Sequence, residues 1–126
     1  MNEQTARILV ADDDPTVGLL MKAALTRAGY TVTTVSNGLD ALVSFGTEAF
    51  AMVLLDVEMP GLDGYQVCSE LRRLYGSALP IVLITGHDDQ KASAAAFKAG
   101  ASEFISKPVN WTTLGERLRP LLLAKT

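Results

Sequence analysis

Five short apolar runs, each followed by a helical pattern, constrain the fold of this 126-residue chain more than any other feature. The runs cover about 7–11, 31–35, 51–55, 80–84 and 103–106, and Val and Ile are enriched in the first, third and fourth. Apolar runs of this length and composition are typical of buried strands. Strands that alternate with helices require right-handed crossovers, which produce a parallel sheet covered by helices on both faces.

The segments between the runs carry signals for the start and the end of helices. The first one opens with Asp14 as a cap and Pro15 at the first helical position, and Gly29 closes it. The later helices are predicted to open at Asn37, at Asp63, near residue 88 and at Asn110. We therefore predict one doubly wound α/β domain over residues 1–126, without a linker or an internal repeat.

Apolar residues recur every three or four positions in most of these helices, so each helix is predicted to turn one apolar face to the sheet. Leu20, Leu39 and Leu74 belong to these predicted faces. The fourth helix, over 88–99, is rich in alanine and offers little apolar bulk to hold it against the sheet. We expect it to be loosely anchored.

Composition limits the classes of partner. The formal net charge of −3 and the isoelectric point near 5.0 leave no basic stripe to displace counterions from a nucleic acid, so we expect protein partners. The single cysteine, Cys68, excludes an internal disulfide, and its place on an apolar helix face predicts a small core residue. No apolar run approaches the roughly 18 residues of a membrane span, and the amino-terminal residues lack a secretory pattern. We expect a cytoplasmic protein.

Carboxylates stand at the ends of two predicted strands. Asp12 and Asp13 follow the first strand, and Asp56 follows the third. Because open parallel sheets bind ligands at the carboxyl ends of their strands, we expect these carboxylates to converge on one small acidic pocket. Hard oxygen ligands that leave room for water and a phosphate are typical of Mg²⁺. The pattern predicts a metal-assisted phosphate site with Mg²⁺ as its cofactor.

Thr85 and Lys107 follow the fourth and fifth strands and complete the predicted site. A phosphoryl group brought to Asp56 would meet the metal on one side, and the Thr85 hydroxyl and the Lys107 ammonium on the other. Phosphoryl transfer depends mainly on positioning and on neutralising the charge of the phosphoryl oxygens, which these groups can supply. We therefore assign Asp56 as the nucleophile, which forms an acyl phosphate.

These residues give the chain a resemblance to the receiver domains of two-component response regulators, over essentially its whole length. The resemblance rests on Ile8–Asp14, Leu55–Gly64, Ile84–Gly86 and Gly100–Pro108. It implies a flavodoxin-like (βα)5 three-layer sandwich with strand order 2-1-3-4-5, and phosphorylation of Asp56 by a histidine kinase or a histidine phosphotransfer protein. It implies a signalling phosphoacceptor that promotes only its own phosphorylation and dephosphorylation, and no enzymatic action on other substrates.

The resemblance also implies the ligands of the metal. Mg²⁺ would be held directly by Asp13 and Asp56, and by the backbone carbonyl of Glu58, while Asp12 would act through water. Two residues depart from the commonest pattern of these domains, because Glu58 stands two positions after the acceptor and His87 two positions after the switch hydroxyl. Both are expected to border the mouth of the pocket, where they would affect how fast water reaches the acyl phosphate.

A conformational switch is the third implication of the resemblance. Thr85 would close on the phosphate, and Phe104 would swing inward to fill the space that Thr85 leaves. The movement would change the surface formed by the fourth helix, the fifth strand and the fifth helix. That surface would bind a partner, a second copy of the chain, or an output domain that this chain does not contain. The peptide bond between Lys107 and Pro108 is expected to be cis.

An alternative from another functional class uses the same residues. Asp12, Asp14 and Thr16 match the D-x-D-x-T pattern of aspartate-nucleophile phosphatases of the haloacid dehalogenase type. In this alternative Asp12 is the nucleophile and Asp14 the general acid, and the chain hydrolyses small phosphate esters. However, the acidic pair at 88–89 precedes the lysine, whereas that family's closing acidic pair follows it, and Asp56 is left without a role. A nucleotide-binding module is disfavoured because neither G-x-G-x-x-G nor the P-loop pattern follows a strand.

Overall fold

The computed structural model describes residues 6–86 and 90–124. Its one sheet is parallel, with strand order β2-β1-β3-β4-β5. The strands are β1 (Arg7–Ala11), β2 (Thr31–Val35), β3 (Met52–Asp56), β4 (Ile81–Thr85) and β5 (Glu103–Ser106). The helices are α1 (Pro15–Arg27), α2 (Gly38–Thr47), α3 (Gly64–Tyr75), α4 (Gln90–Lys98) and α5 (Leu114–Ala124). The predicted doubly wound α/β fold with strand order 2-1-3-4-5 is confirmed.

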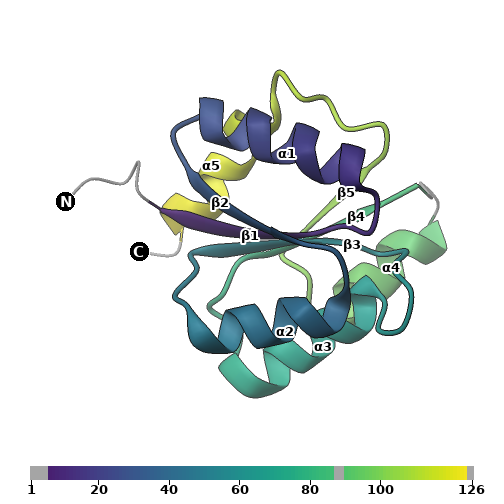
Figure 1. Cartoon of the computed structure of the whole chain (residues 1–126). Coiled ribbons are helices and arrows are strands. Elements are labelled where there is room, and N and C mark those ends of the chain that lie inside the picture. The colour runs from purple at the N-terminus through teal and green to yellow at the C-terminus, as the bar shows by residue number, and fades with distance from the viewer. Residues whose placement is uncertain (1–5, 87–89, 125–126) are drawn as a thin grey trace.

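Helices cover both faces of the sheet, so the molecule has three layers. Helices α1 and α5 lie on one face, and α2, α3 and α4 lie on the other (Figure 1). Successive residues of a strand point to opposite faces, and the two cores divide accordingly. Ile8 and Val10 of β1 belong to the core beneath α1 and α5, while Leu9 and Ala11 belong to the other. Each strand of the interior therefore supplies apolar side chains to both cores.

The caps predicted at Asp14, Asn37 and Asp63 are present. The Asp14 carboxylate accepts hydrogen bonds from the backbone amides of Thr16 and Val17 at the start of α1. Asn37 caps α2, and Asp63 forms a capping box with Gln66 at the start of α3. Each cap satisfies amides that have no partner within the helix, so the first turn of each helix is fixed by a residue adjacent to it in sequence.

Two predicted strands are displaced by one residue. The third and fourth strands run over 52–56 and 81–85, so Asp56 and Thr85 are the last residues of their strands and do not follow them. Their backbones are held in the sheet, because the amide of Val57 donates to the carbonyl of Ile84 and that of Lys107 to the carbonyl of Thr85. Sheet hydrogen bonds thus extend to the functional positions.

The predicted start of the last helix is wrong. Asn110 caps a turn, in which its side chain accepts from the amide of Thr112 and its carbonyl from that of Thr113. Helix α5 begins only at Leu114. A cap residue opens a turn as readily as a helix, and the sequence signal alone does not separate the two.

Several residues of the predicted apolar faces are exposed, among them Leu20, Leu39 and Leu74. A helix that lies on a sheet buries only the residues that point directly at it, and these three stand at the margin of their stripes. The alanine-rich helix buries only small side chains among its described residues, Ala92 and Ala96, in agreement with the little apolar bulk that its sequence offers. No helix in the described part of the chain is both long enough and apolar enough to cross a membrane.

Candidate functional site

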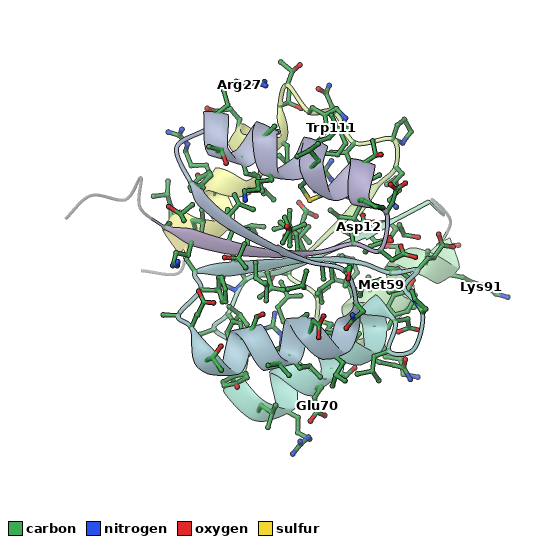
Figure 2. The ribbon with its side chains drawn as sticks, viewed as in Figure 1. Asp12, Arg27, Met59, Glu70, Lys91 and Trp111 are labelled. Atoms are coloured by element: carbon green, nitrogen blue, oxygen red, sulfur yellow. The ribbon has the colours of Figure 1, made fainter. Side chains whose placement is uncertain are left out.

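The three carboxylates predicted to form an acidic pocket lie together. In the pairing of β1 with β3, Ala11 stands opposite Leu55, so the next residues, Asp12 after β1 and Asp56 at the end of β3, lie side by side. One carboxylate oxygen each of Asp12, Asp13 and Asp56 lies within 4.8 Å of the others. Asp12 and Asp56 are buried, with 5% and 3% of their surface exposed, while Asp13 is exposed. Figure 2 shows Asp12 at this edge of the sheet, on the same side as Met59 in the loop after β3.

Lys107 brings the positive charge. Its ammonium nitrogen lies 3.2 Å from Asp56 Oδ1 and 3.9 Å from Asp12 Oδ2. The strand pairing places it there, because Thr85 and Ser106 are partners at the ends of β4 and β5 and Lys107 is the next residue. Burial on its own lowers the pKa of the lysine, but the charges of Asp56 and Asp12 outweigh it and the pKa is raised. The lysine therefore stays charged beside the carboxylates.

Burial and mutual repulsion make both buried carboxyl groups weaker acids. Burial, followed by the nearby charge of Asp12, raises the pKa of Asp56 to about 6. The pKa of Asp12 is also raised, first by burial, although the hydrogen bond from the amide of Asp14 opposes the shift. Among the residues that the structure describes, Lys107 is the cation paired with these two carboxylates, so one positive charge faces two negative ones. A further cation would relieve this repulsion.

A divalent cation suits the donor set. Among residues 6–86 and 90–124, Asp12 Oδ2 is the buried side-chain polar atom that has no hydrogen-bond partner. Buried polar atoms are otherwise almost always paired, so an oxygen left in this way beside two more carboxylates indicates a ligand position. Carboxylate oxygens are the ligands that Mg²⁺ prefers. The residues present therefore fit the predicted Mg²⁺.

The loop between β3 and α3 closes tightly over Asp56. The amide of Glu58 points to Asp56 Oδ1 at 3.4 Å, and the amide of Gly64 donates to the carbonyl of Val57. A Cβ atom on Gly64 would lie 2.6 Å from the carbonyl oxygen of Asp56, a separation that the loop could not accept without moving. From the sequence, Gly64 was placed at the start of the third helix and in the segment Leu55–Gly64 that carries the family resemblance. A glycine directly after a cap residue was the available signal, but it does not reveal which backbone lies opposite.

Two other predicted site residues, Thr85 and Phe104, lie in β4 and β5. Thr85 is fully buried at the end of β4, and Phe104 of β5 is half-buried against the core beneath α2, α3 and α4. The peptide bond between Lys107 and Pro108 is cis, as the resemblance implied. His87 lies outside the described residues. Asp14 is an exposed helix cap and not a member of the carboxylate cluster.

Comparisons with known proteins agree on one family. The family described as "Response regulator receiver domain" matches residues 8–119. The "Probable transcriptional regulator ycf27" of Porphyra purpurea is 38% identical over 122 residues, which cover 97% of this chain and 49% of that protein. The chain thus spans about half the length of the curated relatives it matches.

Solved structures of the same kind superpose closely. A CheY-like response regulator receiver domain protein of Methanospirillum hungatei is 27% identical with a TM-score of 0.89, and the match covers 96% of each chain. The BeF3-activated DrrB receiver domain is 29% identical with a TM-score of 0.86, and the match covers 94% of this chain and 98% of that one.

Proposed function

The chain belongs to the response regulator receiver domain family of two-component signalling, and we propose that its Asp56 accepts a phosphoryl group from the phosphohistidine of a histidine kinase or a histidine phosphotransfer protein. One observation carries the proposal: Lys107 Nζ lies 3.2 Å from Asp56 Oδ1, inside a cluster of three carboxylates at the end of buried strands. The phosphatase alternative has less support, because Asp14, its general acid, is engaged in capping α1.

The transfer needs little from the protein beyond placement and charge. A carboxylate oxygen of Asp56 forms a bond to phosphorus while the bond between phosphorus and the donor histidine nitrogen breaks, and that nitrogen then takes up a proton from solvent. Asp56 must be ionised to attack, and Lys107 favours the ionised form. The Lys107 ammonium also balances negative charge on the phosphoryl oxygens, as the Thr85 hydroxyl would after moving toward them.

Mg²⁺ would be held by Asp13, Asp56 and the backbone carbonyl of Glu58, with Asp12 contributing through water. When bound, the ion would neutralise charge on the phosphoryl oxygens. The chain's own carboxylates explain why it is needed. Without it, an anionic phosphoryl group would have to approach two buried carboxyl groups that already repel each other.

The output is proposed from the same family resemblance. Phosphorylation would move Thr85 and Phe104 and thereby alter the face formed by α4, β5 and α5. That face would then bind a protein partner, a second copy of the chain or an output domain. The curated relatives are named as transcriptional regulators and are about twice as long as this chain, which supports an output domain. The domain would act in the cytoplasm as a signalling phosphoacceptor, promoting only its own phosphorylation and dephosphorylation.

The test is to find where the phosphoryl group goes. The chain is incubated with acetyl phosphate or a phosphorylated histidine kinase, with and without Mg²⁺, and the label is mapped by mass spectrometry. We expect Mg²⁺-dependent labelling at Asp56 and none in Asp56→Asn, which keeps the shape of the side chain but removes the nucleophile. The matched control is Asp14→Asn, which can still cap α1 and should label normally. A label on Asp12 would overturn the proposal in favour of the phosphatase.

A further inference from the structure

Helix α2 begins in close contact with the loop that follows Asp56. Helices α2 and α3 lie on the same face of the sheet (Figure 1), and the contact is made by Gly38, the buried first residue of α2. A Cβ atom on Gly38 would lie 2.7 Å from the carbonyl oxygen of Leu62 and 2.7 Å from Cγ2 of Val67. Carbon atoms in contact pack best about 3.5–4.0 Å apart. A side chain at position 38 would therefore force its neighbours away.

The loop makes a second close contact where α3 begins. A Cβ atom on Gly64 would lie 2.6 Å from the carbonyl oxygen of Asp56. Leu62 precedes Gly64 by two residues, so this short segment is held between the start of α2 and the end of β3. Close contacts at two glycines thus run from α2 through the loop to the proposed acceptor.

The start of α2 is fixed more firmly than the loop. Asn37 Oδ1 accepts the amide of Asp40 at 2.8 Å, and Asn37 Nδ2 donates to the Asp40 carboxylate. One turn further, Ala41 is fully buried in the core. In the loop, by contrast, Pro60 and Gly61 are exposed to solvent. An atom added at the start of α2 would therefore displace the loop and not the helix.

The displaced loop would carry groups of the candidate site with it. The amide of Glu58 lies 3.4 Å from Asp56 Oδ1, and the carbonyl of Glu58 is a proposed ligand of Mg²⁺. The two ends of the loop are joined, because the carbonyl of Val57 accepts the amide of Gly64. A displacement of Leu62 would reach Glu58 within this short closed turn, whereas β3, which is buried along its whole length, would resist it.

We propose that Gly38 is a positioning residue for the Mg²⁺ site, because the missing side chain at the start of α2 sets the position of the loop after Asp56 and hence of the Glu58 carbonyl. Gly38 acts through Leu62 and touches neither the metal nor the phosphoryl group. The inference rests on the proposed Mg²⁺-dependent function of Asp56. Residues that orient a metal ligand from outside typically change metal affinity by about 10- to 100-fold when they are replaced.

Gly38→Ala tests this role, because it adds one methyl group at the contact. The dissociation constant for Mg²⁺ is measured by titration calorimetry at a temperature at which circular dichroism shows every variant to be folded. We expect it to rise by about tenfold or more. The amide resonances of 57–64 should shift even in the Mg²⁺-free protein. Labelling of Asp56 by acetyl phosphate should be lost at low Mg²⁺ and should recover as the Mg²⁺ concentration is raised.

Two matched controls lie in the same helix. Gly46→Ala also adds a methyl group to α2, but its Cβ atom would meet the Tyr75 hydroxyl at 3.7 Å, which is an ordinary contact. It should bind Mg²⁺ as the wild type does. Ala41→Gly adds no atom but destabilises α2, because glycine is a poor helix former. It should lower the melting temperature and leave the dissociation constant for Mg²⁺ unchanged.

A double variant separates the two contacts of Gly38 and serves if the single variant does not fold. In Gly38→Ala/Val67→Ala the crowding against Val67 is relieved, while that against the Leu62 carbonyl remains. Its binding of Mg²⁺ should stay weaker than that of Val67→Ala alone. Equal affinities of these two variants would refute the route through the loop.

Two further results would overturn the inference. One is wild-type Mg²⁺ affinity in Gly38→Ala, and the other is an equal loss of affinity in Ala41→Gly, which would trace the effect to the stability of α2. Failure of the proposed function looks different. If the wild type does not bind Mg²⁺, or if Asp13→Ala binds it equally well, the metal site itself is wrong and the positioning role is wrong with it.

Discussion

Helices α3 and α4 lie on the same face of the sheet, yet they are held by different means. Helix α3 has a capping box and buries Val67, Cys68 and Leu71 completely. Helix α4 buries two alanines, and α3 donates hydrogen bonds to the carbonyl of Ala92 and to that of Gly100 in the turn after α4. Asp56, the proposed acceptor, lies next to the start of α3, and the surface proposed to respond includes α4. A domain that must hold a reactive geometry and also change shape can assign the two tasks to different helices.

The strands differ in burial in the same way, with β3 and β4 on one side of the comparison and β5 on the other. Every residue of β3 and β4 is buried, whereas Ile105 is the buried residue of β5 at the edge of the sheet. Asp56 therefore stands at the end of a rigid strand, and Lys107 follows a more exposed one. We expect the position of the nucleophile to vary less than that of its lysine partner.

The largest difference in the free energy of unfolding is expected between two variants that each truncate a large apolar side chain, one in α3 and one in α4. Leu71→Ala should lower the free energy of unfolding by about 2–5 kcal/mol, because it leaves a cavity in the core. Phe97→Ala should change it by no more than about 0.5 kcal/mol, because that ring is largely in solvent. Urea unfolding followed by circular dichroism measures both. Similar losses for the two variants would show that α4 is packed as firmly as α3, and the comparison would fail.

Removing the charge at Asp56 should stabilise the protein in the absence of Mg²⁺. The pKa of Asp56 is raised to about 6, first by burial and then by Asp12, while an unfolded aspartate titrates near about 3.9. Between these values the folded state binds more protons, so the free energy of unfolding falls as the pH rises from about 4 to about 6. Asp56→Asn escapes this loss and should be more stable by about 1–3 kcal/mol at neutral pH.

The pH series supplies the control for that prediction. The difference in the free energy of unfolding between Asp56→Asn and the wild type should shrink as the pH approaches about 4, because the Asp56 carboxyl group of the folded wild type is then protonated and uncharged. Glu103→Gln removes a charge from β5, whose pair with Arg117 is long and partly exposed, and should have little effect. A pH-independent difference between wild type and Asp56→Asn would mean that shape, and not charge, distinguishes them.

Mg²⁺ bound at the strand ends should raise the free energy of unfolding by less than Leu71→Ala is expected to lower it. At ten times the dissociation constant, binding to the folded state alone adds about 1.4 kcal/mol, which raises the melting temperature by a few degrees. Asp13→Ala should remove this response, while Asp14→Asn, outside the carboxylate cluster, should retain it. Thermal scans with and without Mg²⁺ give the comparison. An unchanged response in Asp13→Ala would count against the proposed ligands.

Much of the site followed from the sequence because it depends on backbone topology. Once the five runs form a parallel sheet with the strand order 2-1-3-4-5 that the family resemblance implied, the ends of β1 and β3 are neighbours, and Asp12 and Asp56 must lie close together. The same argument brings Lys107 to that edge at the end of β5. The alternation of strands and helices predicted that all strands run in one direction, and the resemblance supplied their order. The caps at Asp14 and Asp63 were predictable for a simpler reason, since a cap and its helix are adjacent in sequence.

The tertiary structure alone decided which side chains meet across segments distant in sequence. Periodicity placed Leu74 on an apolar face, but the structure leaves 49% of its surface exposed. The approach of Gly64 to the carbonyl of Asp56, and that of Gly38 to the carbonyl of Leu62, depend on how closely α2 and α3 lie to their neighbours. Nothing in a periodic pattern encodes that separation, because it results from the packing of all the side chains between the elements. The sequence determined the chemistry at the strand ends, and packing determined how that chemistry is connected to α2.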